Sequence, residues 1–159
     1  MTVFETKADL TREAAVAKQI GPILGVSLIK CKKLSHVDYF VLDQNGEVTG
    51  VMEIRTRNYT AEQLNGWGGV FLPVDKLRAI YKVCVNLNLD FYFVVKTTNC
   101  LLHLCFKSGT TWPRLEQTIG GRSNETLRAV EDVGPVYLFP TTLFTRIDHD
   151  PAPLPTGSP

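Results

Sequence analysis

The sequence lacks any segment that would cross a membrane or direct the chain into a secretory pathway. No apolar run approaches the roughly 18 residues that a membrane-spanning helix needs. Residues 1–7, MTVFETK, do not contain the apolar stretch of a signal peptide. The sequence therefore predicts a soluble, cytoplasmic protein with no membrane partner.

The chain also lacks an excess of charge of either sign. Lysine plus arginine total 17 and aspartate plus glutamate total 16, so the formal net charge is +1. The field of the whole protein would not attract nucleic acid or an acidic membrane. Any nucleic-acid partner must therefore be met by a local basic patch.

Cysteine motifs and nucleotide-binding loops are missing as well. The four cysteines, at 31, 84, 100 and 105, form no C-x-x-C pair, so the spacing of a zinc site or redox centre is absent. We expect buried or half-buried thiols in a reducing compartment. Neither Ser108-Gly109 nor Gly120-Gly121 matches a phosphate-binding or dinucleotide-binding loop.

What is present is an ordinary globular composition, 44% hydrophobic and 21% charged. The length of 159 residues fits one domain, which we expect to span residues 1–148. Four of the nine prolines lie in the last nine residues. This enrichment predicts a disordered, Pro-rich tail over residues 149–159.

Hydrophobic periodicity and turn residues predict the elements before that tail. A first helix should run from about 10 to 20 and end at Gly21-Pro22, and a second should run from 73 to about 86. A polar connection is expected over 58–70 and a loop over 108–134. Strands are expected near 26–30, 36–43, 47–54, 89–96, 101–107 and 136–139. This order predicts an α/β (α+β) fold, a mixed sheet with helices on it.

The most informative segment is the hairpin between residues 36 and 57. Asn45-Gly46 between two β-rich runs is a strong signal for a two-residue turn. Such a turn pairs Gln44 with Glu47 and places Asp38 opposite Glu53. Because strand side chains alternate with a period of two, Arg55 then shares their face.

Two carboxylates opposed on a partly buried face repel each other, so something must offset that cost. A divalent cation such as Mg²⁺ or Mn²⁺ would do so, since both ions prefer oxygen ligands. An ion pair of Arg55 or Arg57 with Asp38 or Glu53 would do so too. A different register would instead place the two acids on different faces. The residues alone leave these three alternatives open.

The order of elements and the segment Glu53-Ile54-Arg55 resemble the PD-(D/E)xK nuclease superfamily, whose core is αβββαβ on a mixed sheet. The segment VMEIRTRNYTAEQL is especially similar to short nuclease-like proteins of bacteriophages. The GGR at 120–122, the DVGPV at 132–136 and the late LFTRI are also similar to that group. The resemblance covers about residues 9–147 and implies a restriction-endonuclease-like fold with a central mixed sheet flanked by helices.

The resemblance also implies roles for individual residues. Asp38 matches the metal-bridging aspartate, and Glu53 matches the acid of the E-x-K motif. The backbone carbonyl of Ile54 would be a further ligand of Mg²⁺ or Mn²⁺, and Glu13 is a candidate accessory acid. Lys76, near the start of the second helix, is a candidate contact to a DNA phosphate.

The chain departs from the superfamily at the third motif position, where Arg55 replaces lysine. Arginine keeps the positive charge but cannot act as a base. Water would be activated by the metal alone, or Lys30 or Lys32 would replace the missing lysine, or the site would be weakened. Lys30, Lys32 and Arg57 are candidate contacts to nucleic acid, with a solvated strand end as the alternative. Trp67 and Trp112 could stack on a base or pack their loops onto the domain.

Two functions follow from these observations. The first is metal-dependent hydrolysis of DNA phosphodiesters by a phage-type PD-(D/E)xK protein, with Asp38, Glu53 and Arg55 as catalytic residues. It would act in the host cytoplasm if the chain is phage-encoded. The alternative is a weakened or inactive nuclease-fold protein that binds a host protein or nucleic acid as an inhibitor or adaptor. A homodimer paired through a sheet edge stays open under either hypothesis.

Overall fold

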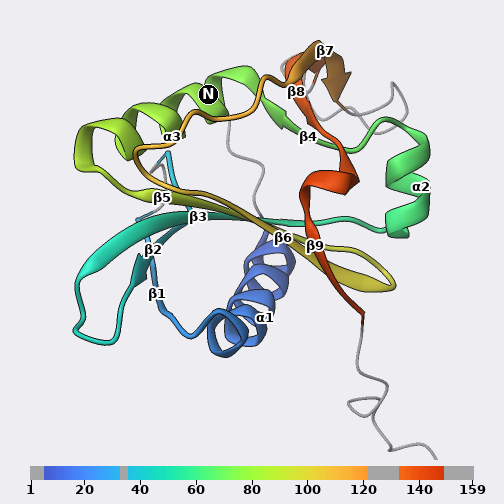
Figure 1. The fold of residues 1–159 in the computed structure, drawn as a ribbon. Helices are drawn as coiled ribbons and strands as arrows, with labels where there is room; N and C mark the ends of the chain where they lie inside the picture. The colour runs from blue at the N-terminus through green and yellow to red at the C-terminus, as the bar shows by residue number, and fades with distance from the viewer. Residues whose placement is uncertain (1–5, 33–35, 122–132, 149–159) are drawn as a thin grey trace, which may run out of the picture.

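A computed structural model describes residues 6–32, 36–121 and 133–148 (Figure 1). The expected Pro-rich tail at 149–159 lies outside the described residues, as do Arg122 and Asp132 of the two late sequence motifs. Within the described residues no helix is both long enough and apolar enough to cross a membrane.

The described chain forms three α-helices and nine strands in two sheets. The helices are α1 (Lys7–Leu24), α2 (Ala61–Gly66) and α3 (Val74–Leu87). A short 3₁₀ turn, Thr141–Leu143, precedes the last strand. The strands are β1 (Ser27–Lys30), β2 (Tyr39–Leu42), β3 (Val48–Thr56), β4 (Val70–Pro73), β5 (Asp90–Lys96), β6 (Cys100–Phe106), β7 (Glu116–Gly121), β8 (Val133–Phe139) and β9 (Thr145–Asp148).

The larger sheet has six strands in the order β1-β2-β3-β5-β6-β9. Strands β3 and β5 are parallel and are joined through α2, β4 and α3, whereas the other neighbours are antiparallel. The predicted mixed sheet is therefore confirmed. Its parallel pair brings the end of β3 beside the end of β5, with Thr56 opposite Lys96.

Figure 1 shows α1 on one face of this sheet and α3 with the smaller sheet on the other. Two groups of buried side chains fill the layers. The α1 face includes Val16, Ile20, Tyr39, Val41, Met52, Ile54, Val94 and Leu101. The α3 face is larger and rich in aromatic rings, including Phe91, Phe93 and Phe139. The hairpin is thus covered on both faces, as its apolar pattern predicts.

Strands β4, β8 and β7 make the smaller sheet, which the sequence did not predict. The expected loop over 108–134 contains β7, whose four residues 116–119 are all exposed and carry no inward-facing apolar pattern. Gly69, just before β4, has a φ of +119°. A Cβ there would lie 2.1 Å from the carbonyl oxygen of Phe139 on β8, so only glycine permits this close approach.

The first helix is longer at both ends than the sequence predicts. It begins after Thr6, which forms a capping box with Asp9. It continues through Pro22 to Leu24, and the C-cap residue Gly25 takes the left-handed conformation at φ +68°. The prediction that Gly21-Pro22 ends the helix is wrong, because the cap that satisfies the last carbonyls stands at Gly25.

The hairpin turn differs from its prediction, although the register beyond it does not. Asp43 pairs with Glu47, so three residues, 44–46, form the loop instead of two. A β-bulge then adds one residue to β3, since Leu42 is opposite Val48 but Val41 is opposite Gly50. The bulge restores the predicted register, and Tyr39 lies opposite Met52.

The four cysteines are free. Cys84 and Cys100 are buried, and Cys31 and Cys105 are half-buried. This agrees with the expectation of buried or half-buried thiols.

Candidate active site

Asp38 lies directly before β2 and faces the far end of β3. One oxygen of its carboxylate, Oδ2, accepts a hydrogen bond from the backbone N–H of Ile54 at 3.2 Å. The side chain is 17% exposed. The hairpin register therefore brings Asp38 to the segment that carries Glu53.

Glu53 is the most deeply buried charged residue in the described part of the chain, at 1% exposure. It lies opposite Phe93 of β5, on the face that α3 covers. Its Oε1 pairs with an Nη2 of Arg55 at 2.8 Å, and the two residues are neighbours on one face of β3. Its Oε2 is buried and accepts no hydrogen bond of good geometry from the described residues.

Lys76, in the first turn of α3, reaches both carboxylates. Its Nζ lies 3.2 Å from Glu53 Oε2 and 3.5 Å from Asp38 Oδ1. The Lys76 side chain is 22% exposed. Two acids and two cations therefore meet at this point, from the segment before β2, from β3 and from α3.

The two carboxyl groups differ in their affinity for a proton. Burial raises the pKa of Glu53 to about 7. The negative charge of Asp38 also raises this pKa, whereas the positive charges of Arg55 and Lys76 lower it. Burial also favours the neutral form of Asp38, but Lys76, a hydrogen bond with Glu53, Arg55 and the Ile54 N–H together lower its pKa. Asp38 is thus the ionised partner, and Glu53 holds a proton readily when no other cation is near.

This donor set fits a hard divalent cation. Mg²⁺ keeps several of its waters and takes one or two carboxylates together with substrate phosphate oxygens. Asp38 and Glu53 supply two carboxylates at one point, and the Glu53 Oε2 that lacks a well-aligned donor is an oxygen available to such an ion. Among the described residues no group of three or more His, Cys, Asp or Glu gathers as a metal site. An ion here would accordingly depend on the two acids, a backbone carbonyl and water.

Glu13 lies on the α1 face of the sheet and is 9% exposed. Its carboxylate pairs with Lys30 of β1 and with the hydroxyl of Tyr39. Burial raises the pKa of Tyr39 to about 12, and Glu13 adds to that shift, so the hydroxyl stays protonated and donates to the carboxylate. Burial would lower the pKa of Lys30, but the hydrogen bond to Glu13 raises it overall.

The remaining predicted residues lie around this centre. Arg57 follows β3, and its guanidinium carbon lies 5.4 Å from the ring centroid of Phe71. Lys32 is exposed. Trp67 is 59% exposed, whereas Trp112 packs in the aromatic core with its ring 5.3 Å from that of Phe91. Of the two alternatives for the tryptophans, packing onto the domain therefore holds for Trp112.

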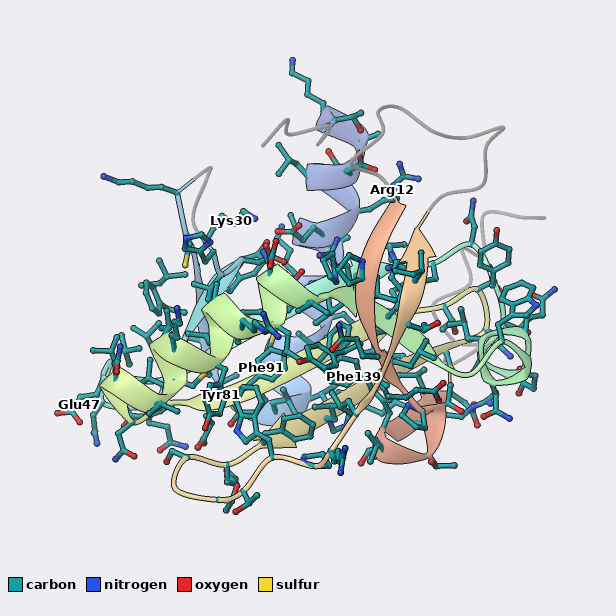
Figure 2. The ribbon with its side chains drawn as sticks, turned by 90° about the horizontal axis from the view of Figure 1, so that it is seen from above. Arg12, Lys30, Glu47, Tyr81, Phe91 and Phe139 are labelled. Atoms are coloured by element: carbon teal, nitrogen blue, oxygen red, sulfur yellow. The ribbon has the colours of Figure 1, made fainter. Side chains whose placement is uncertain are left out.

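Two basic residues near the site were missed from the sequence. Arg12 of α1 and Lys96 at the end of β5 line a pocket together with Arg57. Figure 2 shows Arg12 and Lys30 on the same side of the molecule, far from Glu47 at the hairpin turn. The parallel pairing of β3 with β5 places Lys96 there, and the β-helix-β order of 48–96 was the signal that could have found it.

The chain has a helix, three antiparallel strands, a further helix and a strand parallel to the third. An aspartate stands directly before the second strand, and E-x-R lies on the third. These features define a restriction-endonuclease-like protein of the PD-(D/E)xK class. The chain belongs to the family described as phage putative PDDEXK endonuclease, whose family model matches residues 1–147. A search of curated proteins found no match to the chain. The resemblance stated from the sequence is thereby confirmed at the level of family and fold.

Proposed function

We propose that this protein is a metal-dependent nuclease that hydrolyses phosphodiester bonds of DNA. The observation that supports this best is the meeting of Asp38 and Glu53 beside Lys76 and Arg55. Membership of a phage endonuclease family supports the same function. We expect the protein to act in the cytoplasm of the host cell.

Asp38, Glu53 and the backbone carbonyl of Ile54 would hold a Mg²⁺ or Mn²⁺ ion. The bound ion would supply Lewis-acid stabilisation of a phosphodiester and a lowered pKa for attacking water. Glu13 lies on the other face of the sheet with Lys30 and Tyr39. We therefore propose that Glu13 stabilises the packing of α1 on the sheet and is not a metal ligand.

Lys76 would take the part that lysine plays in E-x-K. Its ammonium lies within 3.5 Å of both acids, and it comes from α3 instead of the third motif position. Lysine can give or accept a proton when its pKa is moved, whereas arginine keeps its charge. Arg55 would then stabilise charge on the phosphate, and Lys30, paired with Glu13, is not needed as a substitute.

A cleavage assay tests this proposal. Purified protein is incubated with supercoiled plasmid or single-stranded DNA and with Mg²⁺, Mn²⁺ or EDTA. We expect cleavage that needs the ion and is abolished by Asp38→Asn. The matched control is Glu47→Gln, an exposed acid at the hairpin turn, which should cleave as the unmodified protein does. Absence of ion-dependent cleavage with every DNA form would contradict the proposal.

One observation favours a second candidate, a nuclease-fold protein that binds a host protein or nucleic acid without cleaving it. Lys76 and Arg55 already neutralise both carboxylates, so the site balances its charge without an ion. Mn²⁺ titration separates the two functions. A nuclease should be stabilised against heat by Mn²⁺, and Arg55→Lys should keep or raise its cleavage. A binding protein should show no stabilisation that depends on Asp38.

A further inference from the structure

A cationic pocket lies between α1 and the ends of the parallel strands β3 and β5. Its volume is about 460 Å³. Three of the residues that line it are basic, namely Arg12, Arg57 and Lys96, and no described residue that lines it is acidic. The Arg12 guanidinium also pairs with the exposed Asp9 at 3.1 Å, and the Arg57 guanidinium donates to the Thr56 carbonyl at 3.1 Å. The other lining residues are small, polar or apolar: Ala15, Val16, Gln19, Thr56, Asn58, Thr97 and Thr98. A lining of basic groups and of hydroxyl and amide donors, with no acidic residue among the lining residues, is the chemistry of an anion site.

The main chain fixes the basic residues of this pocket. Thr56 lies opposite Lys96 in the parallel register, and the N–H of Arg57 donates to the carbonyl of Lys96 at 2.8 Å. Lys96 is half-buried, and burial lowers its pKa. An anion in the pocket would favour the charged form of that lysine.

An exposed aromatic pair follows the pocket along the chain. Tyr59 comes directly after Asn58 of the lining, and its ring lies 4.8 Å from that of Trp67 at an edge-to-face angle of 89°. Tyr59 is 45% exposed and Trp67 is 59% exposed. The carbonyl of Tyr59 accepts a hydrogen bond at 2.9 Å from the N–H of Thr98, which also lines the pocket. The aromatic pair and the pocket are therefore parts of one backbone-linked surface.

The helix between the two aromatic residues is held firmly. Thr60 and Gln63 form a capping box at the start of α2. The side chain of Asn99 accepts from the N–H of Ala61 at 3.1 Å and donates to Glu62 at 2.9 Å. Trp67 is thus presented by a rigid support although more than half of it faces solvent, which is unusual for a ring that serves only packing.

We infer that this surface binds an unpaired strand of DNA, with backbone phosphates in the pocket of Arg12, Arg57 and Lys96 and a base on the Tyr59–Trp67 pair. Every base offers a flat face to an aromatic ring, but only an unpaired base is free to leave its own stack. A blunt duplex could place its phosphates on the basic residues but could not stack a base on the aromatic rings. The inference rests on the proposed function, because it takes DNA as the substrate.

The position of this surface relative to the two acids suits a strand that runs through the active site. Arg57 follows Glu53 by four residues, which corresponds to about 13 Å along an extended chain. The pocket is lined by α1 whereas Glu53 faces α3, so a strand held by the pocket would pass around the end of β3 to bring a phosphodiester to Asp38 and Glu53. The proposed substrate form is single-stranded DNA, or duplex DNA with a single-stranded tail.

Equilibrium binding without metal tests the inference separately from cleavage. A fluorescein-labelled oligo(dT) strand and a blunt duplex of the same length are titrated with protein in EDTA, and anisotropy is recorded at several salt concentrations. We expect the strand to bind at least about 10-fold more tightly than the duplex. Lys96→Gln and Arg12→Gln should each weaken strand binding and reduce the slope of log K against log salt by about 0.7.

Trp67→Leu should weaken strand binding by about 5- to 100-fold and leave the salt slope unchanged, because it removes stacking and no charge. The emission of Trp112, which packs in the core, reports whether that variant is folded. The matched control for the basic residues is Lys82→Gln, an exposed lysine on α3 that does not line the pocket. It should bind as the unmodified protein does.

Three results would overturn the inference: unchanged strand affinity in the pocket variants, unchanged affinity in Trp67→Leu, or equal affinity for strand and blunt duplex. Asp38→Asn is included because it should still bind the strand while cleaving nothing. If the unmodified protein binds the strand through this surface but never cleaves DNA, the proposed nuclease function fails and the inferred strand site stands. If it cleaves DNA and the surface variants bind the strand normally, the proposed nuclease function stands and the inferred strand site fails.

Discussion

Two glutamates are buried in the described part of the chain, one on each face of the six-stranded sheet, and their surroundings differ. The described partners of the Glu13 carboxylate include the ammonium of Lys30 and the hydroxyl of Tyr39, and no second carboxylate is among them. Glu53 meets a second carboxylate and two cations, and one of its oxygens is left without a well-aligned donor. A buried acid that only stabilises a fold needs one good partner. The surplus of charged groups around Glu53 is typical of a site built for chemistry.

Replacing the lysine that pairs with each glutamate should give the largest difference in the rate of DNA cleavage. Lys76→Met removes the ammonium shared by Asp38 and Glu53, and we expect the rate of DNA cleavage to fall by about 100- to 1,000-fold. Lys30→Met removes the ion pair with Glu13 on the other face of the sheet, and cleavage should fall less than about tenfold. Initial rates on plasmid at saturating Mg²⁺ measure both. Equal losses in the two variants would remove the distinction between the faces.

Stability as a function of pH should separate the two glutamates next. The pKa of Glu53 is raised from 4.5 to about 7 in the folded protein. A raised pKa stabilises the fold below the unfolded value, and that stabilisation is lost as the pH rises through the folded value. The free energy of unfolding of the metal-free protein should therefore fall by up to about 3 kcal/mol between pH 4.5 and pH 7.

Urea unfolding in EDTA across this pH range measures the change. Glu53→Gln should flatten the profile, because glutamine cannot gain or lose the proton. Glu47→Gln at the exposed hairpin turn is the control and should keep the slope of the unmodified protein. A slope that survives Glu53→Gln would show that another group causes it.

The smallest expected effect concerns Glu13. Glu13→Gln replaces its ion pair with Lys30 by a neutral contact, and we expect a loss of about 1 kcal/mol of unfolding free energy. The loss is modest because the Lys30 side chain is 40% exposed and water already screens the pair. Urea unfolding at pH 8 measures it, with Glu47→Gln expected within about 0.5 kcal/mol of the unmodified protein. A loss as large as that of breaking a fully buried pair would mean that the two faces are alike.

The geometry of the acidic pair was predictable from the sequence in part. Strand alternation and the hairpin placed Asp38 opposite Glu53, because a period of two leaves few registers that bury the apolar face. The contact of Lys76 with both acids was not predictable, since α3 reaches them only through tertiary packing. The pocket of Arg12, Arg57 and Lys96 likewise depends on strands that are far apart in sequence.

The fold shows the same division between local and distant signals. Helix α3 and strands β3, β5 and β6 carry clear apolar periods and were predicted close to their observed bounds, whereas β2 begins at Tyr39 and not at His36. Strand β7 has no such period, and β4 and β9 are four residues long, so their partners define them more than their own residues do. The two-residue turn was wrong because Asp43 accepts hydrogen bonds from the N–H groups of Asn45 and Glu47, which closes a wider loop.

The β-bulge in β3 has a consequence for how this hairpin can change in evolution. The loop carries one residue more than the alignment of Asp38 with Glu53 requires, and the bulge absorbs it. Removing one loop residue would leave a two-residue turn inside the Asp43–Glu47 pair, and removing the bulged Thr49 would leave a regular ladder. In both cases Tyr39 can stay opposite Met52, so Asp38 keeps its face of the sheet. A change of length at this tip is therefore separated from the acidic pair, and the loop and the bulge can each gain or lose a residue independently.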